Sequence, residues 1–131
     1  MIVVDSNIVA YLYLPGEFSA AAEALHAQDP DWASPVLWRS ELRNILAGYL
    51  RRNTLTLEQC TTIQAEAESL LAGGEHEPDS SSVLELVRDS DCTAYDCEYI
   101  AVAIKLGAKL GTMDNKLLRA FPSRAVPLNG V

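Results

Sequence analysis

Met1-Ile2-Val3-Val4-Asp5 is the stretch that decides the fold. It is a continuous run of apolar and β-branched residues that stops at an acid, a pattern typical of a central parallel strand covered on both faces. Asp5 is therefore expected at the carboxyl end of that strand. Further short strands are predicted at residues 32–34, 109–112 and 125–128, and Pro127 suits the last of them to an edge position.

Helical patterns alternate with these strands. They are predicted at residues 8–14, 18–28, 36–52, 57–72, 83–88, 93–106 and 115–121, with Gly107 as a usual helix terminator. Residues 73–82 are polar and contain Gly, Pro and Ser, which predicts a surface loop. Alternating strands and helices predict an α/β fold whose parallel sheet has helices on both faces, and such sheets bind ligands at the carboxyl ends of their strands.

Length and composition predict one globular domain spanning residues 1–131, because 49% of the residues are hydrophobic and 21% are charged. The net charge of −8 argues against a general nucleic-acid coat protein, since Lys and Arg drive phosphate binding. No basic residue precedes the first apolar run, so we expect neither a secretory signal nor a membrane span. Three cysteines without a Cys-x-x-Cys pair indicate reduced thiols in the cytoplasm.

Four acids stand out because of where the predicted elements place them. Asp5 and Asp114 follow predicted strands, whereas Glu41 and Asp96 lie in predicted helices beside apolar stripes. Each has a plain alternative role: the three aspartates could cap helices, and Glu41 could be a flank residue with its carboxylate in water. Independent caps need not converge, however, and the two helices must pack against the sheet that carries the other acids. The combination therefore predicts a carboxylate cluster at one edge of the sheet.

Such a cluster would repel itself unless cations bound within it. Oxygen ligands without His or Cys select hard ions, so we expect Mg²⁺ or Mn²⁺. One or two such ions could lower the pKa of a bound water, place it in line with a phosphodiester and stabilise charge on the leaving oxygen. No protein nucleophile is needed for that chemistry.

Four motifs occur in a fixed order along the chain: Val3-Val4-Asp5-Ser6-Asn7; Ser34-Pro35 leading to Glu41; Thr93-Ala94-Tyr95-Asp96 with Tyr99-Ile100-Ala101-Val102-Ala103; and Thr112-Met113-Asp114 before Leu117. In this order and spacing the sequence resembles the PIN-domain ribonucleases, particularly the VapC-type toxins of prokaryotic toxin–antitoxin pairs. The resemblance covers essentially the whole chain. Gly111 departs from it, because relatives more often carry an aliphatic residue at that position.

The resemblance implies both a fold and a function. The fold is a three-layer α/β/α sandwich with a central parallel sheet, and the function is Mg²⁺- or Mn²⁺-dependent cleavage of RNA by a cytoplasmic endoribonuclease. The catalytic and metal-binding residues would be Asp5, Glu41, Asp96 and Asp114. Asn7 and Thr112 match polar positions that support the site. The implied partners are the RNA substrate, a second copy in a homodimer, and a cognate antitoxin whose C-terminal segment blocks the cleft, with no membrane.

Two other functions stay open at this point. An aspartyl-phosphate phosphotransfer enzyme also begins with an Asp after its first strand, but Ser6-Asn7 lacks the second acid of the Asp-x-Asp motif in haloacid-dehalogenase-like phosphatases. The second alternative is an inactive PIN-like module that only binds a protein partner. Retention of all four acids argues against such decay.

Basic and aromatic side chains near the acids could contact RNA. The basic candidates are Arg39, Arg43, Lys116 and Arg119, and a solvated surface is their plain alternative. The aromatic candidates for stacking on unpaired bases are Tyr11, Tyr95, Trp32 and Trp38, and core packing is the alternative for most of them.

Overall fold

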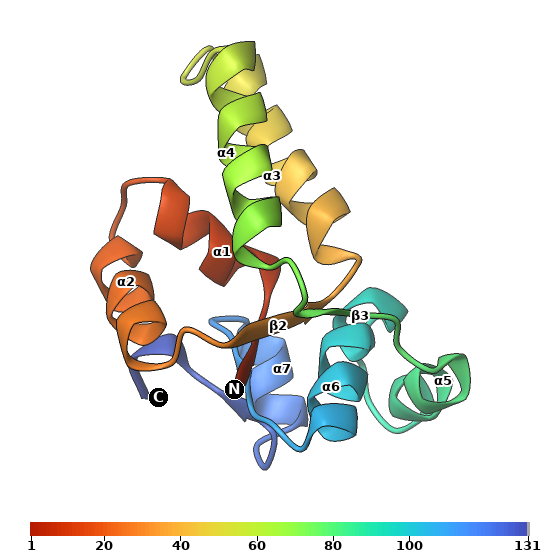
Figure 1. The fold of residues 1–131 in the computed structure, drawn as a ribbon. Coiled ribbons are helices and arrows are strands. Elements are labelled where there is room, and N and C mark those ends of the chain that lie inside the picture. The colour runs from red at the N-terminus through yellow and green to blue at the C-terminus, as the bar shows by residue number, and fades with distance from the viewer. Residues whose placement is uncertain (131) are drawn as a thin grey trace.

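The computed structural model describes residues 1–130, and Figure 1 shows their path. In chain order the elements are β1 (Ile2–Val4), α1 (Ser6–Tyr13), α2 (Ser19–Gln28), β2 (Trp32–Pro35), α3 (Trp38–Arg51), α4 (Leu57–Leu70), β3 (Glu75–His76), α5 (Ser80–Arg88), α6 (Ala94–Leu106), β4 (Leu110–Gly111), α7 (Asn115–Ala120), β5 (Ala125–Val126) and the 3-10 turn η1 (Leu128–Gly130). Each predicted helix is present, with ends that differ by at most a few residues.

The sheet has five strands in the order β3-β2-β1-β4-β5, and all of its pairs are parallel. Its central strand is β1, whose residues Ile2–Val4 are all buried. The prediction from Met1-Ile2-Val3-Val4-Asp5 is therefore confirmed. The strand β5 is an edge strand as predicted, although it ends at Val126 and Pro127 lies just beyond it.

The predicted surface loop at 73–82 is wrong. It contains the edge strand β3 and the first turn of α5. Gly74 permits the strand pairing, because a Cβ at this position would lie 2.2 Å from the carbonyl oxygen of Trp32. Glycine is the residue that tolerates such a close backbone approach. A two-residue polar strand carries no alternation of apolar and polar residues, so its sequence offered no strand signal.

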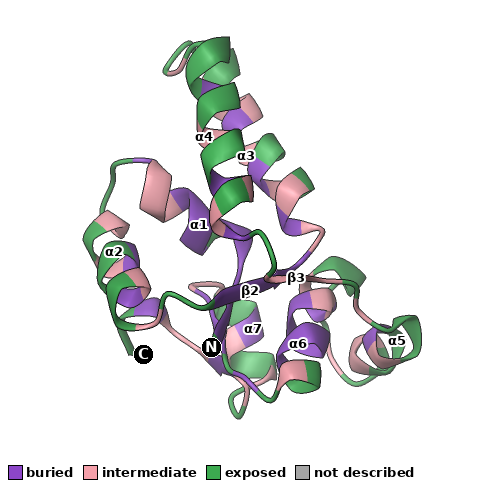
Figure 2. Cartoon of the chain, in the orientation of Figure 1, coloured by how far each residue is buried: buried purple, intermediate pink, exposed green. Residues whose placement is uncertain are grey.

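Helices cover the sheet on both faces, which makes the three-layer α/β/α sandwich that the sequence predicted. Figure 1 shows α2 on one side of the sheet and α5 and α6 on the other. In the same view α3 and α4 form a hairpin that rises above the sheet. Against the strands, α6 packs on β1, β2 and β4. Figure 2 shows buried residues along β1, β2 and α6, and exposed residues along the outer side of α4.

The end of α6 agrees with the sequence, because Gly107 adopts a left-handed conformation with φ of 64° at the helix C-terminus. Within the described part of the chain, none of the helices is both long enough and apolar enough to cross a membrane.

Candidate active site

Asp5 lies directly after β1, at the carboxyl edge of the sheet, and is 6% exposed. One carboxylate oxygen accepts a hydrogen bond of 3.1 Å from the backbone N–H of Ile8, which makes Asp5 the N-cap of α1. The other oxygen accepts a hydrogen bond from the hydroxyl of Thr112. Burial raises the pKa of Asp5 to about 6, and the negative charge of Glu41 also acts in that direction. The plain role of helix cap is thus real, and it leaves lone pairs on both oxygens for a further ligand.

Thr112 connects Asp5 to Asp114. Its side chain is fully buried, and its oxygen accepts a hydrogen bond of 3.0 Å from the backbone N–H of Asp114 while its hydroxyl donates to Asp5. Asp114 caps α7 through a 2.9 Å hydrogen bond from the backbone N–H of Lys116. The supporting position assigned to Thr112 therefore has a visible structural basis, because one hydroxyl holds the ends of β1 and β4 together.

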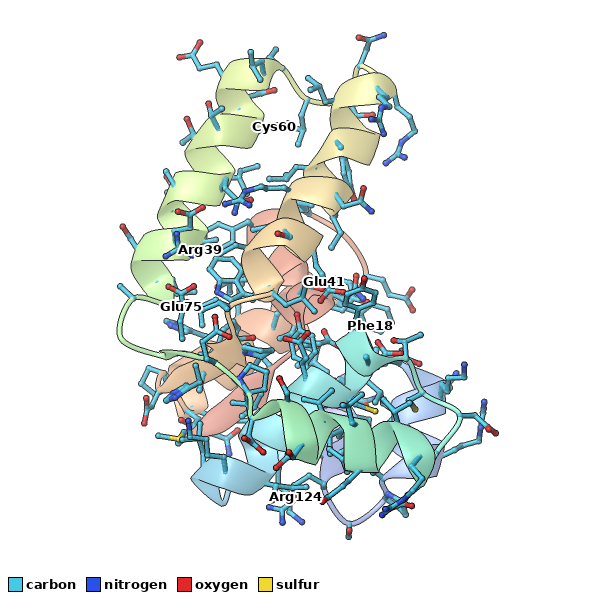
Figure 3. The ribbon with its side chains drawn as sticks, turned by 90° about the vertical axis from the view of Figure 1, so that its right-hand side faces the viewer. Phe18, Arg39, Glu41, Cys60, Glu75 and Arg124 are labelled. Carbon is cyan, nitrogen blue, oxygen red and sulfur yellow. The ribbon has the colours of Figure 1, made fainter. Side chains whose placement is uncertain are left out.

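Glu41 faces the same edge of the sheet from the first turn of α3. Figure 3 shows it at the base of the hairpin of α3 and α4. The Tyr99 hydroxyl donates a 2.5 Å hydrogen bond to its carboxylate, and the Ser6 hydroxyl donates one of 3.4 Å. The pKa of Tyr99 is strongly raised by burial and by the charges of Glu41 and Asp5, so its hydroxyl keeps its proton as a donor.

Asp96 occupies the first turn of α6, one turn before Tyr99. The helix cap here is Thr93, whose hydroxyl oxygen accepts a 3.1 Å hydrogen bond from the Asp96 backbone N–H. No hydrogen bond to the Asp96 carboxylate occurs within residues 1–130, so its plain role as a cap does not apply. Burial raises the pKa of the neighbouring Cys92 thiol, and the charges of Asp96 and Asp114 raise it further, which places both acids near this thiol.

Two connections thus bring the predicted acids toward one edge. Thr112 joins Asp5 to the backbone of Asp114, and Tyr99, on the helix that carries Asp96, donates to Glu41. Across residues 1–130, no three His, Cys, Asp or Glu side chains stand close enough together to hold a metal ion by themselves. The possible ligands nevertheless fit a hard divalent cation, because they are all oxygens. The carboxylate of Asp5 is buried, and the negative charge of Glu41 lies near it. Mg²⁺ in particular keeps several waters and needs only one or two carboxylates.

Sequence reasoning missed Tyr99 and Ser6. The signals were available, because Tyr99 follows Asp96 by three residues on one helix face and Ser6 directly follows Asp5. Asn7, the other supporting position, is exposed at the start of α1, and no hydrogen bond of its side chain is found within residues 1–130.

Arg39 is committed elsewhere and does not face the acids as a free cation. Its guanidinium binds both carboxylate oxygens of Glu75 at 2.7 and 2.6 Å (Figure 3). It also binds one carboxylate oxygen of Glu68 at 2.9 Å. The Trp38 ring nitrogen also donates to Glu75 at 2.9 Å. Arg39 thus fastens β3 and α4 to α3. Contact between Arg39 and RNA stays a prediction.

The aromatic candidates separate by burial. Trp32 and Trp38 are 3% and 0% exposed and pack in the core, and Tyr11 is half-buried against it. Core packing is confirmed for these residues. Tyr95 differs, because 63% of it is exposed directly beside Asp96.

Comparisons with known proteins agree with this geometry. The family model of the PIN domain matches residues 2–121. Ribonuclease VapC3 of Pyrobaculum aerophilum is 31% identical over 134 residues, which cover 96% of this chain and 98% of that protein. The fold is similar to that of FitAcB from Neisseria gonorrhoeae, with a TM-score of 0.77 at 16% identity over 100% of both chains. It is also similar to a toxin–antitoxin complex from Klebsiella pneumoniae, with a TM-score of 0.72 at 16% identity over 100% of both chains.

The parallel five-stranded sheet with acids at its carboxyl edge defines an α/β protein of the PIN-like fold. With a match over residues 2–121 and a relative of 31% identity, the chain belongs to the PIN-domain family. The family resemblance inferred from the four motifs is confirmed.

Proposed function

We propose that this protein is a divalent-metal-dependent endoribonuclease and the toxin of a toxin–antitoxin pair, acting in the cytoplasm. The observation that carries the proposal is the link from Asp5 through Thr112 to Asp114 at the carboxyl edge of the sheet. Support comes from the similarity to Ribonuclease VapC3 and to the toxin–antitoxin complex from Klebsiella pneumoniae.

The proposed roles follow from the surroundings of each acid. Asp5, Asp96 and Asp114 would hold Mg²⁺ or Mn²⁺, and Glu41 would complete the site directly or through water. When bound, the metal supplies Lewis acidity and lowers the pKa of a water. Thr112 keeps Asp5 and Asp114 in register, while Tyr99 and Ser6 hold the carboxylate of Glu41 in one orientation. These hydrogen bonds restrict the rotation of the acid side chains at the carboxyl edge of the sheet. Restricted side chains can hold a phosphodiester in one position for cleavage.

The decisive experiment is an RNA cleavage assay with the purified chain. Single-stranded RNA incubated with Mg²⁺ or Mn²⁺ should be cut, and EDTA should prevent the cutting. Asp31→Asn is a matched control, because it removes one exposed carboxylate just before β2, at the opposite edge of the sheet. It should cleave like the wild type, whereas Asp114→Asn should not. Absence of cleavage across a broad RNA set would refute the nuclease.

The phosphotransfer alternative is weakened by the setting of Asp5. Asp5 is buried, and Ser6-Asn7 after it supplies no second acid that could act as the general acid of a phosphotransfer reaction. The inactive module remains the competing reading, and the cleavage assay separates it from the enzyme.

Divalent metal is expected to raise the melting temperature. A ligand that binds only the folded state stabilises it by mass action, by about 2.7 kcal/mol at a concentration one hundred times its dissociation constant. Calorimetry in EDTA, Mg²⁺, Mn²⁺ and Zn²⁺ measures this effect, and Zn²⁺ should not be required. An unchanged melting curve across millimolar Mg²⁺ and Mn²⁺ would count against the metal site.

Tyr99→Phe is expected to lower cleavage by about 10- to 150-fold while leaving Asp5, Asp96 and Asp114 in place. The change removes the 2.5 Å donor to Glu41, and a hydrogen bond to a charged group contributes about 1.5–3 kcal/mol. The Mg²⁺ concentration for half-maximal activity should rise as well, since Glu41 loses its fixed orientation. A variant that is only less stable, with the same Mg²⁺ dependence, would show that Tyr99 has a structural role alone.

A cognate antitoxin is expected to inhibit by placing an Arg or Lys among these acids, where a guanidinium can pair bidentately with carboxylates. Replacing basic residues near the antitoxin C-terminus should restore cleavage in the purified complex. If the complex stays inactive after these replacements, the antitoxin acts in another way.

Light scattering of the toxin alone tests the homodimer that belongs to the proposal.

A further inference from the structure

A hollow of about 390 Å³ opens beside the acids, between α1, α3 and the start of α6. We name it the Tyr95 hollow. Glu41 and Ser6 are among the residues that line it, so it is continuous with the candidate active site. Its volume lies within the range of about 300–1,000 Å³ that is usual for sites of small ligands.

Two neighbouring rows of side chains on α3 line the Tyr95 hollow. Leu37, Glu41 and Ile45 recur every four residues, and Ser40 and Asn44 form a parallel polar row. Leu37 and Ile45 are half-buried and provide apolar contact surface. Ser40 and Asn44 are exposed and provide a hydroxyl and an amide.

Tyr95 completes the Tyr95 hollow from α6. It is 63% exposed although it is a large aromatic residue in the turn that carries Asp96. The core does not use its ring, in contrast with Trp32 and Trp38. An exposed ring facing a partly apolar hollow offers a flat surface on which a planar ligand can stack.

The polar groups of the Tyr95 hollow favour a neutral ligand with several donors and acceptors. The side-chain amides of Asn7 and Asn44 make no hydrogen bond within residues 1–130, so both are free to bind a ligand. Neither Lys nor Arg lines the hollow in that same range, and Glu41 adds a negative charge. A phosphate would therefore be poorly accommodated, whereas amides are the usual partners of base edges.

We propose that the Tyr95 hollow binds one unpaired nucleobase of the RNA, next to the bond that is cut, by stacking on Tyr95 and hydrogen bonding to Asn7 and Asn44. The inference rests on the proposed ribonuclease function and adds a determinant of specificity to it. It explains how a chain with a net charge of −8 could still hold RNA, since stacking does not depend on positive charge.

The experiment combines cleavage with binding on single-stranded oligoribonucleotides, using the full chain. Tyr95→Ala should lower kcat/KM by about 5- to 150-fold, the usual effect of removing one stacking partner, and Tyr95→Phe should keep most of the activity. Leu84→Ala is the matched control, because Leu84 is also 63% exposed but lies on α5, outside the hollow. Its kcat/KM should equal that of the wild type. Both alanine variants should melt at the wild-type temperature.

A substrate with an abasic residue beside the cut site makes the test specific. Its kcat/KM should be lowered for the wild type but not lowered further by Tyr95→Ala, because both changes delete the same contact. Asn44→Ala should alter the preference among the four bases at that position. Equal cleavage by wild type and Tyr95→Ala, or full additivity with the abasic substrate, would overturn the inference and leave the nuclease standing.

A binding measurement distinguishes failure of the proposed nuclease from failure of the proposed nucleobase site. The dissociation constants of labelled oligoribonucleotides are measured by fluorescence anisotropy in an Asp96→Asn background, with and without Tyr95→Ala. If the wild type cuts no RNA but Tyr95→Ala still weakens binding in this background, the Tyr95 hollow is supported and the nuclease is refuted. Absence of both cleavage and binding would overturn both.

Discussion

Asp96→Asn should reduce Mg²⁺-dependent RNA cleavage by about 1,000-fold, because the Lewis acidity of a bound metal contributes several kcal/mol and each 1.4 kcal/mol corresponds to a factor of ten. The substitution keeps the shape of the side chain and exchanges one carboxylate oxygen for an amide nitrogen, which does not bind Mg²⁺. The cap of α6 is untouched, since Thr93 provides it. The free energy of unfolding without metal should therefore change by less than about 0.5 kcal/mol.

Paired measurements separate the two roles of Asp96. Metal-free melting and Mg²⁺-dependent cleavage are recorded for wild type, Asp96→Asn and the Asp31→Asn control. A mutant that melts lower in EDTA yet cleaves RNA normally would show that Asp96 serves the helix and not the site.

Asp5→Asn should stabilise the metal-free protein at pH 8 while abolishing cleavage. The pKa of Asp5 is raised from 3.8 to about 6, chiefly by burial. The folded state therefore prefers the neutral carboxyl group, and the stability associated with it is complete below pH 4 and is lost as the pH rises through about 6. At pH 8 the ionised group costs roughly 3 kcal/mol, which Asn removes while its side-chain oxygen still accepts from Ile8. The Asn amide nitrogen replaces the oxygen that accepts from Thr112, so the Thr112 hydroxyl has to turn and accept instead of donating.

The measurement is urea denaturation in EDTA between pH 4 and pH 8. The difference between Asp5→Asn and wild type should nearly vanish at pH 4 and reach its maximum above pH 7. A difference that is independent of pH would mean that ionised Asp5 is not destabilising in the folded protein. Saturating Mg²⁺ should reduce the difference at pH 8, because only the wild type gains from binding.

The central strand and most helices could be predicted because their signals are local and strong. The apolar, β-branched run that contains Val3 and Val4 is typical of a covered strand, and Gly107 ends a long apolar helix where its left-handed φ is needed. The strand β3 could not be predicted, because its pairing depends on the close approach of Gly74 to Trp32 and on the carboxylate of Glu75 reaching Arg39. Both contacts join residues more than thirty positions apart in the chain.

The candidate site likewise has features that local sequence signals predict and features that depend on contacts between distant residues. The four motifs that contain Asp5, Glu41, Asp96 and Asp114, in their order and spacing, were enough to infer the family. Their catalytic roles stay a prediction. The hydroxyls that connect the acids were harder to foresee, since Tyr99 and Thr112 reach their partners only after α6 and β4 have packed against β1. The pairing of Arg39 could not be foreseen for a related reason: its partner Glu75 belongs to the strand that the sequence did not reveal.

The brevity of the outer strands has a consequence for how other chains can attach. Both β3 and β5 are two residues long. Very short edge strands offer almost no row of free backbone groups, which is how many proteins avoid edge-to-edge aggregation. The same brevity prevents an incoming peptide from extending the sheet as an added strand. A regulator or a second subunit must therefore recognise side chains on the helices and loops, and replacing those side chains can alter the choice of partner without disturbing the backbone ladder of the sheet.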